Sequence, residues 1–355
     1  MESRGATAAL ESGLVERETE VRLLLLAAFC GEHLLLLGPP GTAKSELGRR
    51  LSAVCGGASF FERLLTRFSV PEELFGPLSM RGLENDQYVR QTDGYLPTAT
   101  VAFVDEVFKA NSAILNSLLT ILNERLFDNG NERVEVPLLC LVGASNELPE
   151  SEELDALYDR FLLRSSVEQV SAGSLAGLLA MKAGELPGKA IGSKAAAADA
   201  ASPVTNTMPL TVKDFEGVKS AAEAAVEVPQ SVVDLIVDLR AHLQDKCEPP
   251  VYVSDRRLVK SVALLRVAAY TNGRAAVSEF DCLLLANVLW QRPSEANTVR
   301  EWILERLAQD RGVDQVQYLL AGLFGRACRA DGDKSECEAL RKEAASLRAV
   351  LSSQI

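Results

Sequence analysis

The sequence predicts an α/β protein: helices cover both faces of a parallel sheet, and an all-helical domain follows. Three apolar runs have the length of buried strands, and polar or glycine residues follow each of them: residues 33–37, 100–106 and 137–146. Helical patterns separate these runs, and buried strands that alternate with helices are typical of a parallel sheet. Beyond residue 210 the patterns are helical.

The first predicted elements surround a glycine-rich loop. Helical periodicity runs from Glu16 to Cys30, and Gly31 ends it. The run His33–Leu37 predicts a buried strand, and helical spacing returns in residues 45–55. Strand, glycine-rich loop and helix, in this order, are the context of a phosphate-binding loop.

The next strands also end in polar residues. The run Thr100–Glu106 predicts a strand that ends in two acids, and Ser112–Glu124 predicts a helix with one leucine-rich stripe. The run Pro137–Asn146 predicts a third strand. Because ligands of parallel sheets bind at the carboxyl ends of the strands, we expect the three polar clusters to form one site.

Two hairpins interrupt this plan. Residues 125–136 carry Asn129-Gly130 at their centre, a dipeptide that strongly favours a hairpin turn. The segment Met80–Tyr95 predicts a second hairpin that turns at residues 84–86.

Composition divides the chain into four parts. We predict an αβα core over residues 1–170, a linker or insertion rich in Ala, Gly and Ser over 171–210, a helical lid domain over 211–310 and a helical extension over 311–355. The helix boundaries of the lid follow from capping residues. They are Pro229 at a first helical position, Ser254 as N-cap with Gly273 beyond the end of that helix, Ser278 and Asp281 as a capping box, and Ser294 at the start of the last helix.

Charge and cysteine usage exclude several classes of function. The formal charge of −12 disfavours a protein that mainly grips nucleic acid. The 7 cysteines are single and there are 2 histidines, so no zinc site is predicted and the thiols are expected to be reduced. The apolar run Leu23–Cys30 is much shorter than the ~20 residues of a membrane span. We expect an intracellular protein of the cytoplasm, with an organelle such as the chloroplast as the alternative.

The glycine-rich loop carries the predicted nucleotide contacts. Backbone N–H groups of such a loop and of the following helix point at phosphate oxygens. Lys44 would reach the β- and γ-phosphates of ATP, and Ser45 would place its hydroxyl on Mg²⁺. The alternative is a turn that merely contains a lysine. The predicted binding residues are Gly38, Pro39, Pro40, Gly41, Thr42, Ala43, Lys44 and Ser45.

Ala43 stands where the usual loop has glycine before the lysine. We expect position 43 to lie already in the helix, with negative φ, where alanine costs little.

Asp105 and Glu106 resemble a Walker B pair. Asp105 would hold Mg²⁺ through water, and Glu106 would orient and deprotonate the attacking water. A solvated acidic turn is the alternative. It is disfavoured because the pair follows a phosphate-binding loop by about sixty residues.

Three further polar residues are candidates, each with a structural alternative. Asn146 would position the same water, or it simply ends a strand. Arg160 suggests an arginine finger supplied to another subunit, or a surface arginine paired with an aspartate. On a helical projection Arg256 points away from the core of the helical domain and would reach a nucleotide between the two domains, or it is a solvated arginine at a helix start.

In this order the segments GPPGTAKS, VAFVDE, the hairpin, VGASN, YDRF and VSDRR resemble an AAA+ P-loop NTPase core with its lid. The segment FGPLSM…GYLPTATVAFVDE is similar to the helix-2 insert clade, which includes MoxR proteins, magnesium-chelatase ATPase subunits and MCM helicases. Loops with alanine before the lysine are familiar in that clade. TRFSVPEELFGPLS, DEVFKANSAILNSLLTILNER and ASNELPE resemble the RavA group of MoxR ATPases.

This resemblance implies roles for the candidates: Asn146 as sensor 1, Arg160 as arginine finger and Arg256 as sensor 2. It implies a Mg²⁺-dependent ATPase that forms hexameric rings and remodels a protein client, often with a partner that carries a von Willebrand factor A domain. The alternatives are a nucleotide-gated scaffold with little turnover and a magnesium-chelatase-like motor subunit. A DNA motor of the MCM type is disfavoured by the acidic charge.

Overall fold

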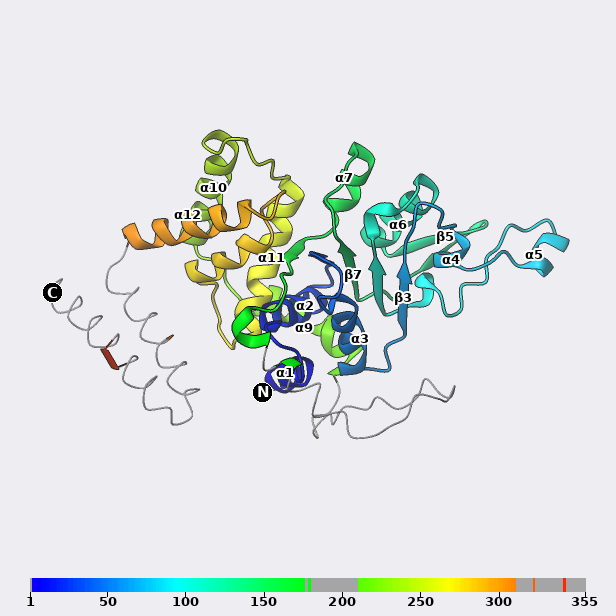
Figure 1. Cartoon of the computed structure of the whole chain (residues 1–355), viewed down its shortest axis with the longest axis horizontal. Helices are drawn as coiled ribbons and strands as arrows, with labels where there is room; N and C mark the ends of the chain where they lie inside the picture. The colour runs from blue at the N-terminus through cyan, green and yellow to red at the C-terminus, as the bar shows by residue number, and fades with distance from the viewer. Residues whose placement is uncertain (1, 176–177, 180–209, 311–321, 323–340, 343–355) are drawn as a thin grey trace.

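The computed structural model describes residues 2–175, 178–179, 210–310, 322 and 341–342 (Figure 1). The strands are β1 Leu34–Leu37, β2 Cys55–Gly56, β3 Phe60–Leu64, β4 Val101–Asp105, β5 Leu126–Asn129, β6 Glu132–Glu135, β7 Cys140–Ser145, β8 Leu163–Ser166 and β9 Leu210–Thr211. The α-helices are α1 Glu2–Glu11, α2 Glu18–Cys30, α3 Lys44–Val54, α4 Glu72–Phe75, α5 Met80–Glu84, α6 Ser112–Glu124, α7 Glu152–Tyr158, α9 Val212–Ala225, α10 Gln230–Asp245, α11 Asp255–Thr271 and α12 Glu295–Asp310. The 3-10 helices are η1 Leu96–Thr98, η2 Val107–Lys109 and η3 Glu279–Asn287.

The central sheet is parallel, with the strand order β3-β4-β7-β1-β8. Leu34 lies beside Val142 of β7 and Leu163 of β8, so β1 is paired on both sides along its whole length. The carboxyl ends of β1, β4 and β7 therefore meet at one edge of the sheet. The predicted α/β class, a parallel sheet between helices with a helical lid, is confirmed.

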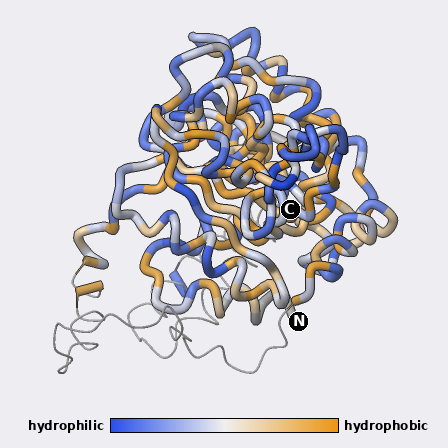
Figure 2. The backbone as a smooth tube through the Cα atoms, turned by 90° about the vertical axis from the view of Figure 1, so that its right-hand side faces the viewer, coloured by the Kyte–Doolittle hydropathy of each residue, from blue (hydrophilic) through white to orange (hydrophobic). Residues whose placement is uncertain are grey.

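Alternate residues of each strand enter two different cores, because successive side chains of a strand point to opposite faces. Leu34 and Leu36 pack with α2, α3 and the helical domain, whereas Leu35 and Leu37 pack with α6. All four leucines are buried, so β1 has no polar face. In Figure 2 hydrophobic segments run through the interior of the molecule.

The helices α9 to α12 form a lid domain that shares the first of these cores with α2. The rings of Phe29 in α2 and Phe215 in α9 stack with their centroids 4.8 Å apart. Figure 1 places α9 beside α2, with α10, α11 and α12 on the side of the molecule away from β3. The lid is thus continuous with the core through apolar contacts.

Two buried arginines close the seam between core and lid. Arg164 of β8 donates to the carbonyl oxygens of Tyr158, Phe161 and Trp290, and its guanidinium lies 3.5 Å from the centroid of the Tyr158 ring. Arg257 of α11 donates to the Val288 carbonyl within the lid, and its Nε lies 4.0 Å from a carboxylate oxygen of Asp159 in the core. Both are at most 1% exposed, and burial is the main cause that lowers the pKa of each.

Most predicted helix and strand ends agree with the structure. Gly31 ends α2 with φ 64°, Asn129-Gly130 closes the hairpin of β5 and β6, and Ser254 caps α11. Pro229 is the N-cap of α10 rather than its first residue. The capping box of Ser278 and Asp281 is present, but it begins the 3-10 helix η3 rather than an α-helix.

The predicted hairpin over Met80–Tyr95 is wrong in part. Met80–Glu84 form the short helix α5, because the Ser79 hydroxyl accepts from the N–H of Gly82 and begins a helical turn. The isolated bridge between Leu78 and Arg90 shows that the segment still folds back on itself.

Two predicted regions lie mainly outside the described residues: most of the linker over 171–210 and most of the extension over 311–355. The five cysteines of the described part, Cys30, Cys55, Cys140, Cys247 and Cys282, are free thiols. No helix among the described residues is long and apolar enough to cross a membrane.

Tyr158→Phe should weaken the docking of the lid. The Tyr158 hydroxyl donates to the carbonyl of Gln291 over 2.6 Å, and its loss should lower the free energy of unfolding by about 0.5–1.5 kcal/mol. Tyr88→Phe, at a side chain that is 62% exposed, is the matched control and should change stability little. Urea titration of both variants measures the difference, and equal stabilities would contradict the hydrogen bond.

Candidate functional site

The loop between β1 and α3 is held by the strands on both sides of β1. The N–H of Gly38 donates to Ser145 of β7 over 3.1 Å, and Val167 donates to Leu37 over 2.7 Å. A Cβ atom on Gly38 would lie 2.1 Å from the carbonyl oxygen of Val167. Glycine is therefore required at position 38, and the loop leaves the sheet along a path that its neighbours fix.

Ala43 does not have the conformation that the sequence suggested. It is the N-cap of α3 with φ 63° and ψ 24°, in the left-handed region, rather than a residue of the helix. A left-handed conformation costs a residue with a Cβ atom about 1–2 kcal/mol, which explains why glycine is usual before the lysine. The alanine in this loop is therefore strained.

Lys44 uses its three ammonium hydrogens inside the site. Its Nζ donates to the carbonyls of Gly38 and Pro39 over 2.6 and 2.9 Å and to the Oδ1 of Asn146 over 3.4 Å. The residue is 7% exposed. Burial lowers the pKa of Lys44, and the negative charges of Asp105 and Glu106 oppose this shift.

Glu106 belongs to the same network. The Nδ2 of Asn146 donates to the Oε1 of Glu106 over 2.7 Å, and the Oε2 lies 3.2 Å from the Nζ of Lys109. Glu106 adopts a left-handed backbone, φ 52°, directly after β4. The structure thus brings Lys44, Glu106 and Asn146 together at the carboxyl ends of β1, β4 and β7, where the sequence placed them.

The donor set at this edge suits a hard cation and a phosphate. Asp105 offers a carboxylate whose Oδ1 accepts from the N–H of Glu106 over 3.0 Å, and Ser45 lies in the first turn of α3. Mg²⁺ prefers one or two such oxygen ligands together with phosphate oxygens. The N-terminus of α3, with Lys44 beside it, favours an anion.

Nothing in the sequence indicated Arg17, a buried residue that hydrogen-bonds the backbone of the loop. It is 6% exposed, and it donates to the carbonyl of Thr42 over 3.2 Å and to that of Glu168 over 2.6 Å. These bonds tie the loop to the segment after β8. No motif marks this arginine, since it lies far from the loop in sequence.

Arg160 and Arg256 do not lie beside the loop between β1 and α3. Arg256 donates to the Oδ1 of Asn123 over 2.5 Å, in the last turn of α6. Arg125, two residues later, donates to the carbonyl of Gly31, just before β1 begins. This is the amino-terminal edge of the sheet, opposite to Lys44. Arg256 does point away from the core of the lid, but it does not approach the loop of its own chain.

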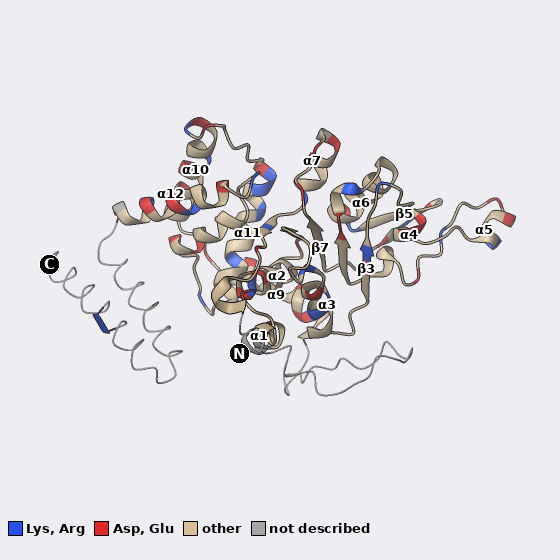
Figure 3. Ribbon diagram, in the orientation of Figure 1, with Lys and Arg blue, Asp and Glu red and all other residues tan. Residues whose placement is uncertain are grey.

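Arg160 is a neighbour of Arg256. Burial, and then the positive charge of Arg256, lowers the pKa of Arg160. Its Nη1 lies 3.5 Å from a carboxylate oxygen of Asp159, so the pairing that the sequence offered as the structural alternative is present. Its Nε is buried without a hydrogen-bond partner. Figure 3 shows basic residues at the start of α11, where Arg256 lies.

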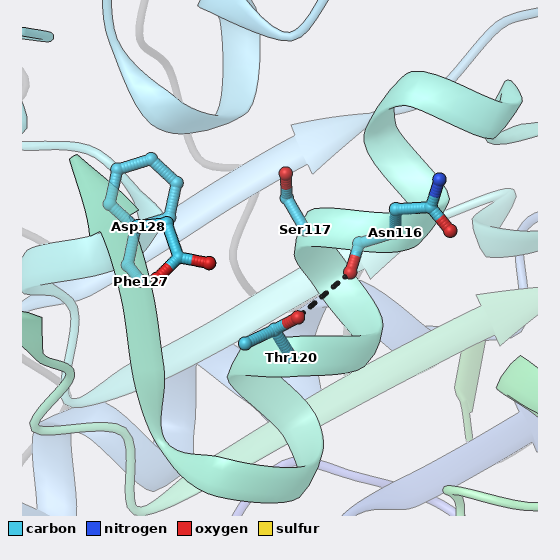
Figure 4. Close-up of a pocket in the computed structure, with 5 residues that line it drawn as sticks. All are labelled: Asn116, Ser117, Thr120, Phe127 and Asp128. Atoms are coloured by element: carbon cyan, nitrogen blue, oxygen red, sulfur yellow. Dashed lines mark hydrogen bonds between the residues drawn. The ribbon is translucent and has the colours of Figure 1, made fainter. Parts of the chain in front are cut away.

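A polar pocket between α6 and β5 is separate from these residues (Figure 4). The Thr120 hydroxyl donates to the carbonyl of Asn116 over 3.2 Å at its wall. None of the candidate site residues lines it. The residues that line it are Asn116, Ser117, Thr120, Phe127 and Asp128.

A phosphate-type loop, an acidic pair, a polar residue on the neighbouring strand and a helical lid together define an AAA+ ATPase. Comparison with known proteins agrees. Residues 2–199 match the model of the MoxR domain in the MoxR-vWA-beta-propeller ternary systems, and residues 231–303 match an AAA lid domain. Since the first match covers more than half of the chain, the protein belongs to the MoxR family of AAA+ ATPases.

Individual proteins are also similar to this chain. The uncharacterized proteins MJ0812 and MJ0079 of Methanocaldococcus jannaschii are both 40% identical to this chain, covering 81% and 79% of it and 70% and 68% of their own lengths. Protein MoxR of Paracoccus denitrificans is 27% identical, covering 48% of this chain and 51% of its own. A crystal structure of an inferred ATPase from Cytophaga hutchinsonii superposes with a TM-score of 0.65 at 16% identity, covering 86% of this chain and 93% of its own, which shows the common fold.

Ala43→Gly should relieve the strain at the loop. Removing the Cβ atom removes the steric strain of the left-handed conformation, whereas glycine raises the entropy of the unfolded chain and so opposes this gain. We expect the free energy of unfolding to rise by about 0.5–1 kcal/mol. Ala241→Gly, in the exposed interior of α10, should instead lose about 0.8–1 kcal/mol. Denaturant titration measures the free energy of unfolding of both variants. If Ala43→Gly loses as much stability as Ala241→Gly, Ala43 is not strained.

Proposed function

We propose that this protein hydrolyses ATP with Mg²⁺ at the edge formed by β1, β4 and β7. The observation that carries the proposal is the hydrogen-bonded chain from Lys44 through Asn146 to Glu106. Lys44 begins the helix after β1, whereas Glu106 and Asn146 directly follow β4 and β7. The three groups match the point charge, the base and the orienting amide that phosphoryl transfer requires. The alternative, a turn that merely contains a lysine, does not explain why Lys44 lies in one hydrogen-bonded network with Asn146 and Glu106.

In this proposal the N-terminus of α3 and Lys44 bind the phosphates. Lys44 exchanges one of its present bonds for a phosphate oxygen. Mg²⁺, held by Ser45 and Asp105, would neutralise charge on the phosphates. Asn146 orients the attacking water, and Glu106 accepts its proton. Gly38 and its neighbours in the loop contribute backbone N–H groups.

We propose that Arg160 and Arg256 act on the nucleotide of an adjacent subunit. Both lie at the amino-terminal edge of their own sheet, and Arg160 carries a buried Nε without a partner. Arg256 adds a second positive charge beside Arg160, while Asp159 pairs with Arg160 at 3.5 Å, so the two cations together favour a further anion. In a closed ring every subunit would have such a neighbour, and we propose a homohexamer because the RavA-like motifs resemble those of ring-forming ATPases.

The proposed task of the ring is to remodel or mature a protein client, as in the RavA group. The segment around α5 projects from the core in Figure 1. The tip of the β5–β6 hairpin contacts this segment, because the Asn129 side chain bonds both the N–H and the carbonyl of Arg90. A partner with a von Willebrand factor A domain is consistent with the description of the matched family. The free thiols of the described part suit a reducing compartment such as the cytoplasm.

Glu106→Gln tests hydrolysis. The amide cannot accept the proton of the attacking water, so steady-state turnover should fall to background while ATP binding persists. Phosphate release and binding of a fluorescent ATP analogue measure the two properties. A wild-type protein that binds ATP but turns over no faster than Glu106→Gln would instead be a nucleotide-gated scaffold.

Arg160→Ala tests the shared site. We expect turnover to fall by about 10³- to 10⁵-fold with nucleotide binding intact, the usual contribution of an arginine finger. Lys44→Ala should be inactive as well. Mixing the two variants should restore part of the activity, because some interfaces then combine an intact loop with an intact Arg160. A mixture no more active than its components would place Arg160 outside the catalytic site.

A further inference from the structure

We propose that Lys109 is a positioning residue that restrains Glu106 and slows basal hydrolysis. The inference rests on the proposed ATPase function and adds a residue to which the sequence analysis assigned no role. Lys109 ends η2, three residues after Glu106, and its Nζ lies 3.2 Å from the Oε2 of that carboxylate. The lysine side chain is 43% exposed and that of Glu106 is 13% exposed.

The carboxylate of Glu106 is held from two directions. Asn146, which also contacts Lys44, donates to Oε1 over 2.7 Å, and Lys109 at the end of η2 lies 3.2 Å from Oε2. The left-handed backbone at Glu106, φ 52°, fixes where the side chain starts. The two contacts therefore select one orientation of the carboxylate.

The two contacts respond differently to catalysis. When Glu106 takes a proton from the attacking water, the resulting hydroxide attacks the γ-phosphorus and the bond to the ADP oxygen breaks. The glutamate becomes neutral in that step, so its attraction to the Lys109 cation is lost. An interaction that is stronger in the ground state than in the transition state raises the barrier. Lys109 thus slows the reaction, whereas Asn146 also contacts Lys44 of the loop.

The geometry of η2 keeps this pair together. Lys109 N–H donates to the carbonyl of Glu106 over 2.8 Å, which closes the turn and returns the lysine to the carboxylate. Asn111 then caps α6 by accepting from Ile114, so the turn is fixed at both ends. Arginine at position 109 could make the same ion pair, whereas methionine has a similar length and no charge.

The test compares Lys109→Met and Lys109→Arg with the wild-type protein at saturating ATP. Lys109→Met should raise kcat about two- to fivefold, the range set by an ion pair of this exposure, with KM for ATP unchanged. Lys109→Arg should restore the wild-type kcat. Lys246→Met, which removes an exposed lysine of the lid, is the control and should leave kcat unchanged.

The outcomes separate the two proposals. A wild-type protein that hydrolyses ATP, together with a Lys109→Met variant whose kcat is equal or lower, overturns the role of Lys109 and leaves the ATPase function standing. A rise in kcat that Lys109→Arg also shows overturns it as well, because charge would not be the cause. Wild-type turnover no faster than that of Glu106→Gln overturns both proposals.

Discussion

The pairing of β1 with strands on both sides is the constraint on which the site depends. Backbone hydrogen bonds from β7 and β8 hold the end of β1, and the carbonyl of Val167 leaves no room for a side chain on Gly38. These contacts fix the path of the loop where it leaves β1. The same register places the ends of β4 and β7 beside it, so the Asn146 side chain contacts both Lys44 and Glu106.

Two residues at this edge of the sheet have a strained backbone. Ala43 and Glu106 both adopt left-handed backbone conformations, which for residues with a Cβ atom are costly and persist where surrounding structure imposes them. Here the hydrogen bonds of the loop, the buried Arg17 and the short turn of η2 impose them. The result is a set of polar groups that hydrogen-bond one another, and the proposed binding of a phosphate would exchange some of these bonds.

The seam between core and lid decides where the remaining cations lie. Buried Arg164 bonds the Trp290 carbonyl across the seam, Arg257 of the lid lies 4.0 Å from Asp159 of the core, and stacked aromatic rings join α2 to α9. This docking places the start of α11 at the amino-terminal edge of the sheet, beside Arg160. The two arginines are thereby separated from the phosphate loop of their own chain, and the proposed site needs a second subunit to be complete.

The sequence by itself determined the elements whose signals are local. Apolar runs gave the buried strands, capping residues gave the helix ends, and the polar residues after three strands gave Lys44, Glu106 and Asn146 as one site. Only the tertiary structure decided the backbone of Ala43, the helix at Met80–Glu84, the support from Arg17 and the pairing of Lys109 with Glu106. It also decided the side of the sheet on which Arg256 lies, because that depends on how two domains pack, and no periodicity within one helix encodes a contact with another domain.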